Sequence, residues 1–415
     1  SHQGISQYQI SVPQYYKEEL KVKDALFANL NRLDAKHQLH SRLDYQERLN
    51  LAAEYSLSQR TLPLLLTLNN VERLLLNEQV RNGLKQKNFL GNNAVILPTL
   101  QALGLTQTEK SQANLYQPGD VIRFNMTIPP TFFDKHSYYK GSYCQVLSVD
   151  LSTNTLTLQN TDNHQVTWNP FIEQNLKQVD VFRVSERELR AGDTLVWTRT
   201  VKDNQDKTLN RIKNQSASVV SAARESVTVR LQNGQMTTFN PTESQQQHWD
   251  YGYATLLKNR DGSISKDTVF VLQNDKIDHK TLQLLQECVE HLQEHKKAVT
   301  LVCNDIEKLK ETIASGGIGN SVDSKKPEMA YLRSEALSEH QTTVTQPIFH
   351  GLQGEYLKAR QLNPEFLAKN LAKTENPERD YPPEFRLACD VVDYISLYHS
   401  ERDAVLDLKT LKLEA

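Results

Sequence analysis

The sequence has little of several features that would assign a protein class directly. Only four of its 415 residues are cysteines (Cys144, Cys288, Cys303 and Cys389), and none forms a Cys-x-x-Cys pair or a spacing typical of zinc ligands. We therefore expect reduced thiols rather than a disulfide framework or a zinc site. No apolar run approaches the roughly 18 residues of a transmembrane helix, and no signal peptide is recognisable. These absences favour a cytoplasmic protein without membrane insertion.

Neither sign of charge is in excess, since 48 basic residues meet 50 acidic ones and give a formal net charge of −2. The chain as a whole is therefore not expected to attract nucleic acid or an acidic membrane surface. Any such contact must depend on local basic patches.

Motifs of catalysis and cofactor binding are also missing. There is no G-x-x-x-x-G-K-[ST] loop to hold phosphates, and the glycine-rich stretch 316–319 is not followed by lysine. His291 and His295 have a spacing that can bind metal on a helix, but no third ligand accompanies them. No Ser-His-Asp or Cys-His set can be assigned. The sequence predicts no catalytic residue, no metal and no cofactor, and we do not expect this chain by itself to be an enzyme.

The chain does contain a repeated pattern. Residues 115–124 and 189–197 each place a Gly-Asp turn before a strand of alternating apolar and polar residues. Each copy ends with an aromatic residue followed by Asn-Pro, at 168–170 and 239–241. Turns and alternation of this kind predict a small antiparallel β-barrel, present twice in tandem.

Strands and helices alternate on both sides of the repeats. The expected elements are a helical region at 15–57, a strand at 61–67, a helix at 71–84 and a strand at 94–97, and then strands at 268–272 and 298–302 with helices at 280–296 and 305–313. Because this pattern is typical of an α/β domain, we expect the barrels to be an insertion within one such domain.

Four segments carry a family resemblance. Residues 67–81 contain T-x-N-x-x-x-R with a later Asn and Arg, 115–124 read LYQPGDVIRF, 248–255 read HWDYGYAT, and 388–411 contain SERDAV. In this order they resemble conjugative relaxase–helicases of the TraI/TrwC (MobF) type. The resemblance implies an α/β fold: a RecA-like second helicase domain with two tandem small antiparallel β-barrels inserted, plus a C-terminal helical segment.

The resemblance also implies a division into domains. The expected parts are a helical lead-in with the first part of the RecA-like domain at 1–114, barrels at 115–172 and 173–246, the remainder of the RecA-like domain at 247–315, a linker at 316–380, and a helix opening the next helicase module at 381–415. Since the first residue is Ser1, we expect a piece of a longer protein.

Departures from the family pattern point to an inactive motor. Active members continue after the third segment with Thr-x-His-Lys-x-Gln-Gly, whereas residues 256–263 read LLKNRDGS. The arginine of helicase motif VI, which reaches the γ-phosphate, has no counterpart in 288–295. The resemblance therefore implies the vestigial superfamily 1 helicase copy of a parent protein that is a DNA relaxase (a transesterase) and an ATP-dependent helicase.

In such relatives the vestigial copy resembles a single-stranded DNA clamp that carries a translocation signal for type IV secretion. The partners implied are single-stranded DNA, the type IV secretion coupling protein and the other domains of the parent. The implied setting is plasmid conjugation, in the cytoplasm of a bacterial donor cell, with the protein moved to the recipient together with the DNA.

A single-strand clamp needs cations for phosphates and aromatic faces for bases. The candidates are Arg199, Lys202, Lys207, Arg211 and Lys213 in the second repeat, Lys135, Tyr138, Tyr139 and Lys140 in the first, Arg73 and Arg81 on the helix at 71–84, Lys258 and Arg260 in the altered motif, and Trp197 and Trp249. The simpler interpretation is that the loops are solvated hairpins and that the aromatic residues, including Trp168 and Phe239, pack in cores.

Two other functions stay open at this point. The chain could be an ATP-dependent helicase motor half that is active when joined to its missing nucleotide-binding domain, although the altered motifs disfavour this. It could also be an interaction scaffold for the secretion coupling protein, which the near-zero net charge permits.

Overall fold

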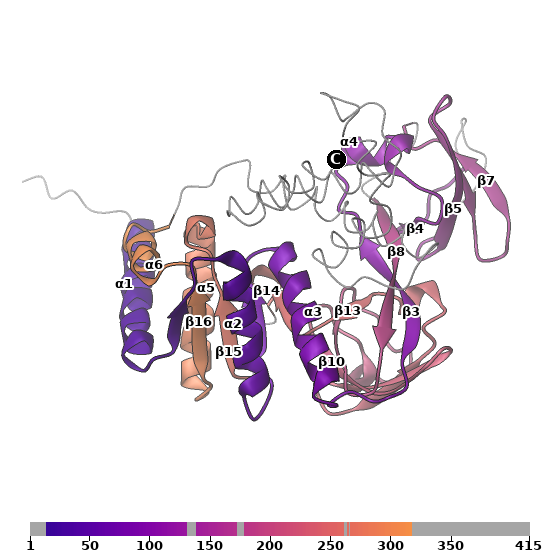
Figure 1. Cartoon of the computed structure of the whole chain (residues 1–415). Coiled ribbons are helices and arrows are strands. Elements are labelled where there is room, and N and C mark those ends of the chain that lie inside the picture. The colour runs from indigo at the N-terminus through magenta and orange to yellow at the C-terminus, as the bar shows by residue number, and fades with distance from the viewer. Residues whose placement is uncertain (1–13, 131–137, 172–177, 261–263, 265, 318–415) are drawn as a thin grey trace, which may run out of the picture. The chain divides into compact units, whose positions relative to one another are not determined.

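The computed structural model describes residues 14–130, 138–171, 178–260, 264 and 266–317 (Figure 1). The chain divides into two compact units, which are described separately. The first takes its described residues from Ser1–Leu68 and Thr255–Ser321, and the second from Asn69–Ala254. Apart from Gly316 and Gly317, the linker and the helix predicted at 316–380 and 381–415 lie outside the described residues.

The first unit is built on a five-stranded sheet in the order β1-β16-β15-β2-β14. Its strands are β1 (Leu39–Ser41), β16 (Val299–Cys303), β15 (Thr268–Val271), β2 (Leu64–Thr67) and β14 (Ala254–Leu256). The pairs β1–β16, β16–β15 and β15–β2 are parallel. Every residue of β15 and β16 is buried, as the continuous apolar runs of parallel strands lead one to expect.

Helices pack on this sheet. Its buried core is shared by α1 (Gln14–Ala35), α5 (His279–Glu294) and α6 (Ile306–Ala314), and α2 (Tyr45–Ser58) also contacts β15 and β16. Three of these helices begin after an aspartate whose side chain accepts a backbone N–H three residues on. Such caps satisfy a donor that the first helical turn leaves unpaired. The prediction of a mixed α/β fold with a parallel sheet is thus confirmed.

One element of this unit differs from the sequence prediction. The helical region predicted at 15–57 consists of two helices separated by β1. The chain turns at His37, whose φ is 56°, and then forms three residues of edge strand paired with β16. A strand this short has too few residues to show a period of two.

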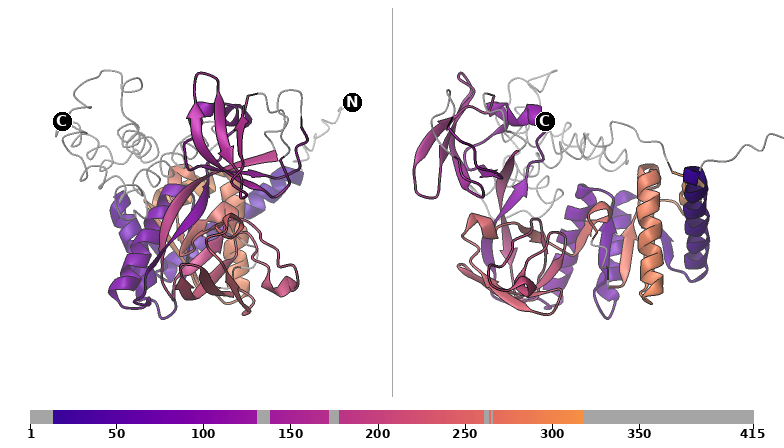
Figure 2. Two further views of the ribbon diagram at one scale, coloured as in Figure 1. Left: turned by 90° about the vertical axis from the view of Figure 1, so that its right-hand side faces the viewer. Right: turned by 180° about the vertical axis from the view of Figure 1, so that it is seen from behind.

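The second unit contains α3 (Asn70–Gln86), the short helix α4 (Gln107–Lys110) and two antiparallel sheets (Figures 1 and 2). The six-stranded sheet has the order β3-β8-β4-β5-β6-β7 and the five-stranded sheet β12-β11-β10-β9-β13. The strands of the first are β3 (Val95–Ala102), β4 (Val121–Phe124), β5 (Tyr143–Asp150), β6 (Thr155–Gln159), β7 (Gln165–Trp168) and β8 (Val179–Leu189). Those of the second are β9 (Thr194–Trp197), β10 (Ser216–Ala223), β11 (Ser226–Leu231), β12 (Met236–Phe239) and β13 (Trp249–Tyr251).

The boundaries of these sheets differ from the sequence prediction in three places. The strand predicted at 94–97 as part of the α/β domain is β3, which pairs antiparallel with β8. Strand β8, whose residues fall within the range 173–246 predicted for the second barrel, belongs to the first sheet because it pairs with both β3 and β4. Strand β13, predicted in the α/β domain, pairs with β9 in the second sheet.

The repeated Gly-Asp turn has the same geometry in both copies. Gly119 and Gly192 have φ angles of 93° and 92°, a left-handed conformation that favours glycine. The N–H of Gly119 donates to the carbonyl of Val146 in β5, and the N–H of Gly192 donates to the carbonyl of Val219 in β10, both at 2.8 Å. Each of these two strands has a register shift at this point. The sequence repeat is therefore a structural repeat.

The aspartate of each turn is buried and ion-paired with an arginine. Asp120 accepts two hydrogen bonds from Arg183 on β8, at 2.8 and 2.9 Å. Asp193 accepts two from Arg81 on α3, at 2.9 and 3.1 Å. Two parallel charge-assisted bonds of this kind fix the orientation of both side chains. The second pair ties α3 to the five-stranded sheet.

The aromatic residues that end each copy pack in the core, as the simpler interpretation predicted. Trp168 meets Phe124 edge-on at 6.2 Å between ring centroids, and Phe239 meets Trp197 edge-on at 5.8 Å. Within the described residues, no helix has the length and apolar character of a membrane span. The three cysteines in the same part of the chain are buried and unbridged.

Candidate nucleic-acid interface

Most of the predicted binding residues lie in two long loops of the second unit. The β4–β5 loop covers residues 125–142, and the β9–β10 loop covers residues 198–215. Both loops follow the strand that the Gly-Asp turn launches, so they occupy the same place in the two copies of the repeat.

Matching backbone contacts confirm that the loops are equivalent. An isolated antiparallel bridge joins Ile128 to Tyr138 in the β4–β5 loop and Val201 to Arg211 in the β9–β10 loop. The residues of each bridge exchange two backbone hydrogen bonds of 2.7 to 3.0 Å. The bridge brings the two ends of each loop together, and each loop is called an arm below.

Each arm presents an exposed lysine at the same position. The backbone N–H of Lys140 donates to the hydroxyl of Thr127 at 3.3 Å, and that of Lys213 donates to the hydroxyl of Thr200 at 3.0 Å. Both lysine side chains are exposed. Fixed backbones with free ammonium groups suit contact with phosphate, which a lysine binds as a point charge.

The two arms start from one polar junction. Asn125, the first residue of the β4–β5 loop, donates to Asp180 at 2.8 Å and accepts from Arg199 at 3.2 Å. Arg199 also donates to Asp180 at 3.0 Å, and Arg123 donates to Asn125. Two arginines meet a single carboxylate in this cluster, so the junction carries an excess of positive charge.

A neutral histidine lies against the junction. His248 shares a 2.7 Å hydrogen bond with the Tyr143 hydroxyl, and its ring packs edge-on to Phe182 at 5.0 Å. Burial, together with the nearby positive charges of Arg199 and Arg123, lowers the pKa of His248 to about 3. The imidazole is therefore uncharged at neutral pH, and the positive charge here belongs to the arginines.

The exposed candidates in the two arms are cations and one aromatic ring. They are Tyr139, Lys140, Lys202, Lys207 and Lys213. The ring of Tyr139 is 67% exposed and therefore open to a base. Arg199 keeps 31% of its side chain exposed while paired with Asp180. Lys135 lies outside the described residues.

Three aromatic candidates are core residues, contrary to the prediction that they contact DNA. Trp197 is 2% exposed, Trp249 is 0% exposed and Tyr138 is 5% exposed. The Tyr138 ring stacks on Phe124 with 4.5 Å between centroids. Small sheets have few positions for large apolar side chains, and these rings fill them, so no face is left for base stacking.

The two arginines of α3 are also structural in this arrangement. Arg81 is 2% exposed and is bound by Asp193 and Glu188, the latter at 3.1 Å. Arg73 is paired with Asp250 at 3.3 Å, and the side chains are 13% and 3% exposed. Neither guanidinium faces solvent in the way that a phosphate contact requires.

Arg211 is buried in an unusual way. Its guanidinium lies over the rings of Trp197 and Phe239, at 5.3 and 4.9 Å from their centroids, and donates to Gln246. The residue is 7% exposed and lines a pocket of about 370 Å³. Burial lowers the pKa of Arg211 to about 10, which marks a cation that its surroundings compensate only in part.

The altered motif belongs to the first unit, whereas the two arms belong to the second. Lys258 is exposed, whereas Arg260 pairs with Glu287 of α5 at 2.8 Å. The ion pair occupies Arg260, and of these two candidates only Lys258 presents its side chain to solvent.

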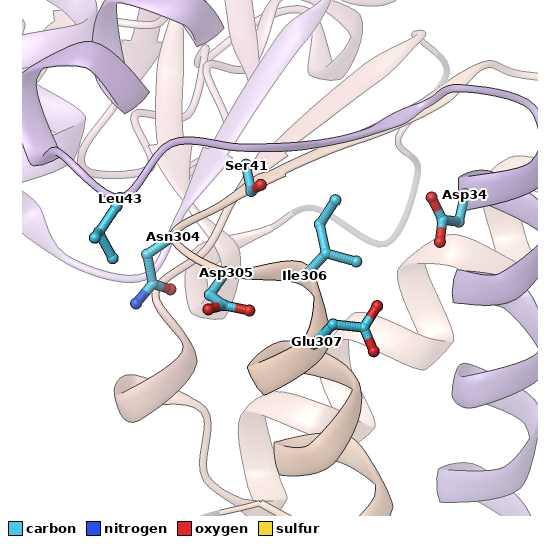
Figure 3. Close-up of a pocket in the computed structure, with 7 residues that line it drawn as sticks. All are labelled: Asp34, Ser41, Leu43, Asn304, Asp305, Ile306 and Glu307. Atoms are coloured by element: carbon cyan, nitrogen blue, oxygen red, sulfur yellow. The ribbon is translucent and has the colours of Figure 1, made fainter.

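The first unit has a pocket of about 520 Å³ at the carboxyl ends of β1 and β16 (Figure 3). Ligands of α/β folds commonly bind at this edge of a sheet. The pocket is lined by Asp34, Ser41, Leu43, Asn304, Asp305, Ile306 and Glu307. Three carboxylates and no cation are among these lining residues, although Asp34 is paired with Lys310 at 2.8 Å. Such a lining does not favour a nucleotide phosphate. Asp305 is engaged as the cap of α6, accepting from the Lys308 N–H at 3.0 Å.

Sequence reasoning missed the junction itself. Arg123, Asn125 and Asp180 were not predicted to belong to the site, although Arg123 and Asn125 flank the end of β4 in the first repeat. A residue-by-residue alignment of the two repeats pairs Asn125 with Thr198, which directly precedes Arg199. That alignment shows that Asn125 and Arg199 stand at the start of equivalent loops, but their contact and the role of Asp180 come from the folded chain, in which β8 pairs with β4.

Comparison with known proteins gives little. No family model matches the sequence, and no curated protein matches it. Among solved structures, unliganded Pif1 from Bacteroides sp. aligns over 71% of this chain and 51% of that chain, with 7% identity and a TM-score of 0.21. Bacteroides Pif1 bound to ssDNA aligns over 69% and 50%, with 9% identity and a TM-score of 0.18. The chain spans about half the length of these structures, and at such scores the likeness establishes neither fold nor activity.

Proposed function

We propose that this chain is a non-catalytic, single-stranded DNA-binding segment of a helicase-like protein, and that the two arms of the second unit contact the strand. The observation that carries the proposal is the repetition of an exposed lysine, Lys140 and Lys213, at the same position of two equivalent arms. Two copies of one cationic arm, rooted in one junction, suit a ligand that itself repeats.

The chemistry of the arms fits a single strand. Lysines track phosphates without reading sequence, and an exposed ring such as that of Tyr139 stacks on an unpaired base. Base stacking on an aromatic side chain contributes about 1–3 kcal/mol per base. The small net charge of the chain is compatible with this function because the cations are concentrated locally.

Three observations support the proposed absence of catalysis. No phosphate-binding loop occurs in the sequence, and the second half of α5 contains no arginine to reach a transferred phosphoryl group. The pocket at the sheet edge of the first unit presents carboxylates instead of the cations that a nucleoside triphosphate needs.

The finer assignment depends on the family resemblance. We propose that the first unit is RecA-like, that the parent is a conjugative relaxase–helicase, and that this segment carries a type IV translocation signal read by the coupling protein. Plasmid DNA transfer from the cytoplasm of a donor cell, with the protein translocated alongside, is the setting that this implies. The four resembling segments support it, although the fourth lies outside the described residues.

A charge-removal series tests the DNA interface. Changing Lys140, Lys202, Lys207 and Lys213 together to glutamine should weaken binding of a labelled (dT)₂₀ strand in anisotropy titrations. Each lost phosphate contact lowers the salt slope of log K by about 0.7, so the slope should fall by up to about 3.

The matched control changes four exposed lysines of the first unit to glutamine: Lys36, Lys280, Lys296 and Lys308. It alters net charge by the same amount at positions that belong to the other unit of the chain. Equal loss of affinity in both variants would contradict the proposed interface, because it would reflect overall charge alone.

A further inference from the structure

The repeat contains one chemical difference at a position where its two copies are otherwise alike. Tyr138 and Arg211 occupy the same place, since each forms the bridge of its arm. Tyr138 stacks on Phe124, and Arg211 lies on Trp197, the residue equivalent to Phe124. A neutral ring therefore fulfils the packing role in the first copy. The charge of Arg211 is not needed for that packing and calls for another explanation.

Arg211 also differs from most of the other buried arginines. Arg81, Arg183 and Arg187 each pair with a buried carboxylate at 2.8 to 3.2 Å. Arg48, which is also buried, lies over the Tyr45 ring and donates to the backbone carbonyl of Arg42 at 3.1 Å. Within the described part of the chain, the guanidinium of Arg211 instead has Gln246 as its hydrogen-bond acceptor and two aromatic rings beneath it. A guanidinium has five N–H donors. Donors that Gln246 does not occupy are available to a ligand in the pocket.

The pocket that Arg211 lines is mostly polar. Its lining includes two carboxylates, Asp203 and Glu243, two cations, Lys202 and Arg211, and amide and hydroxyl side chains such as Asn204, Thr237 and Thr238. Val201, Leu209 and Phe239 supply its apolar part. Its volume of about 370 Å³ suits one nucleoside-sized group. A phosphate would meet as many carboxylates as cations. The lining instead suits a neutral ligand that carries both acceptors and donors.

We propose that this pocket binds one unpaired guanine base. Guanine presents two acceptors, O6 and N7, in the geometry that an arginine fork recognises. Its opposite edge carries N1–H and N2–H₂ donors, which a carboxylate such as Glu243 or Asp203 accepts. Adenine offers an amino donor where guanine has O6 and therefore opposes a guanidinium. The inference rests on the proposed function, because the guanine is taken to belong to a bound single strand.

The test uses twelve-residue oligothymidylates with one central base changed, in anisotropy titrations with the whole chain. We expect guanine at the centre to bind about 10-fold more tightly than adenine or thymine. Replacing guanine with 7-deazaguanine removes N7, and replacing it with hypoxanthine removes the N2 amino group. Both replacements should reduce the preference. Equal affinity for all central bases would overturn the inference while leaving strand binding intact.

Arg211→Tyr is the decisive variant because the first copy shows that tyrosine fits at this position. It should keep the thermal unfolding midpoint and the affinity for pure oligothymidylate but lose the guanine preference. Arg211→Lys keeps the charge without the fork and should also lose the preference. The control is Arg230→Gln, an exposed arginine of β11, which should retain it. A guanine preference that persists in Arg211→Tyr would refute the site.

Free nucleotides separate this inference from the proposed function. If no oligonucleotide binds at low salt, the single-strand proposal fails, and guanosine monophosphate is then compared with adenosine monophosphate by calorimetry. A preference for guanosine monophosphate that Arg211→Tyr abolishes would support the guanine pocket, with a free nucleotide as its ligand. Absence of any preference, or competition by inorganic phosphate as strong as by guanosine monophosphate, would overturn it.

Discussion

Arg81 offers a sharp test of whether the arginines of α3 support the fold or bind DNA. Its guanidinium is held by Asp193 and Glu188, and it lies 4.9 Å from the ring centroid of Tyr251. Arg81→Met keeps the length of the side chain but leaves the carboxylate of Asp193, which is 0% exposed, without its cation. Removing one partner of a buried ion pair costs about 3–5 kcal/mol.

The expected loss is large enough to measure in two ways. Urea unfolding followed by tryptophan fluorescence reports on the second unit, which contains Trp168, Trp197 and Trp249. Thermal unfolding should shift by about 2–4 °C per kcal/mol for a unit of this size. The double variant Arg81→Met with Asp193→Asn removes both charges and should recover part of the loss.

The control is Arg224→Met, since Arg224 is exposed at the turn between β10 and β11 and should change stability by less than about 0.5 kcal/mol. At temperatures where Arg81→Met remains folded, its affinity for (dT)₂₀ should equal that of the unaltered chain. A loss of stability below about 1 kcal/mol, or a loss of DNA affinity with the fold intact, would refute the structural role of this residue.

Three further predictions concern pH and backbone geometry. Burial raises the pKa of Glu78 from an ordinary 4.5 to about 7, despite the opposing charge of Lys85. The folded chain therefore binds more protons than the unfolded chain between these pH values, and stability should fall as pH rises from 4.5 to 7. Glu78→Gln should abolish this trend in urea titrations. Burial lowers the pKa of His248 to about 3, so the unfolded chain binds the extra proton; stability should fall as pH drops below 6.5, and His248→Phe should flatten that decline. Gly192→Ala combines a φ of 92° with a Cβ 3.1 Å from the Phe89 carbonyl oxygen, and should cost more stability than Gly234→Ala, whose φ is 87° in open space; equal losses would show that φ alone matters.

Local patterns predicted most individual elements but not their assignment to sheets. The Gly-Asp turn, the Asn-Pro stop and the capped helices α5 and α6 are visible in a few adjacent residues, because turn and cap chemistry is local. Membership of β3, β8 and β13 depends on partners far away in the chain. An apolar run has the same appearance whichever sheet it joins, so those three strands were placed in the wrong sheet.

The candidate site shows the same division between local and distant information. Sequence reasoning predicted that the two loops would expose basic residues, and Lys140, Lys202, Lys207 and Lys213 are exposed. It did not predict which cations would be buried. The carboxylates that pair with Arg73 and Arg81 lie more than a hundred residues away, in β13 and in the turn before β9. Only the folded chain brings such pairs together.

The most direct test of the central claim is anisotropy of a labelled single strand with the whole chain, across a salt series and with duplex of the same sequence as competitor. The account predicts that the single strand is preferred and that log K falls with log salt at about 0.7 per phosphate contact. Absence of single-strand binding at low salt, or displacement by duplex at equal concentration, would contradict it.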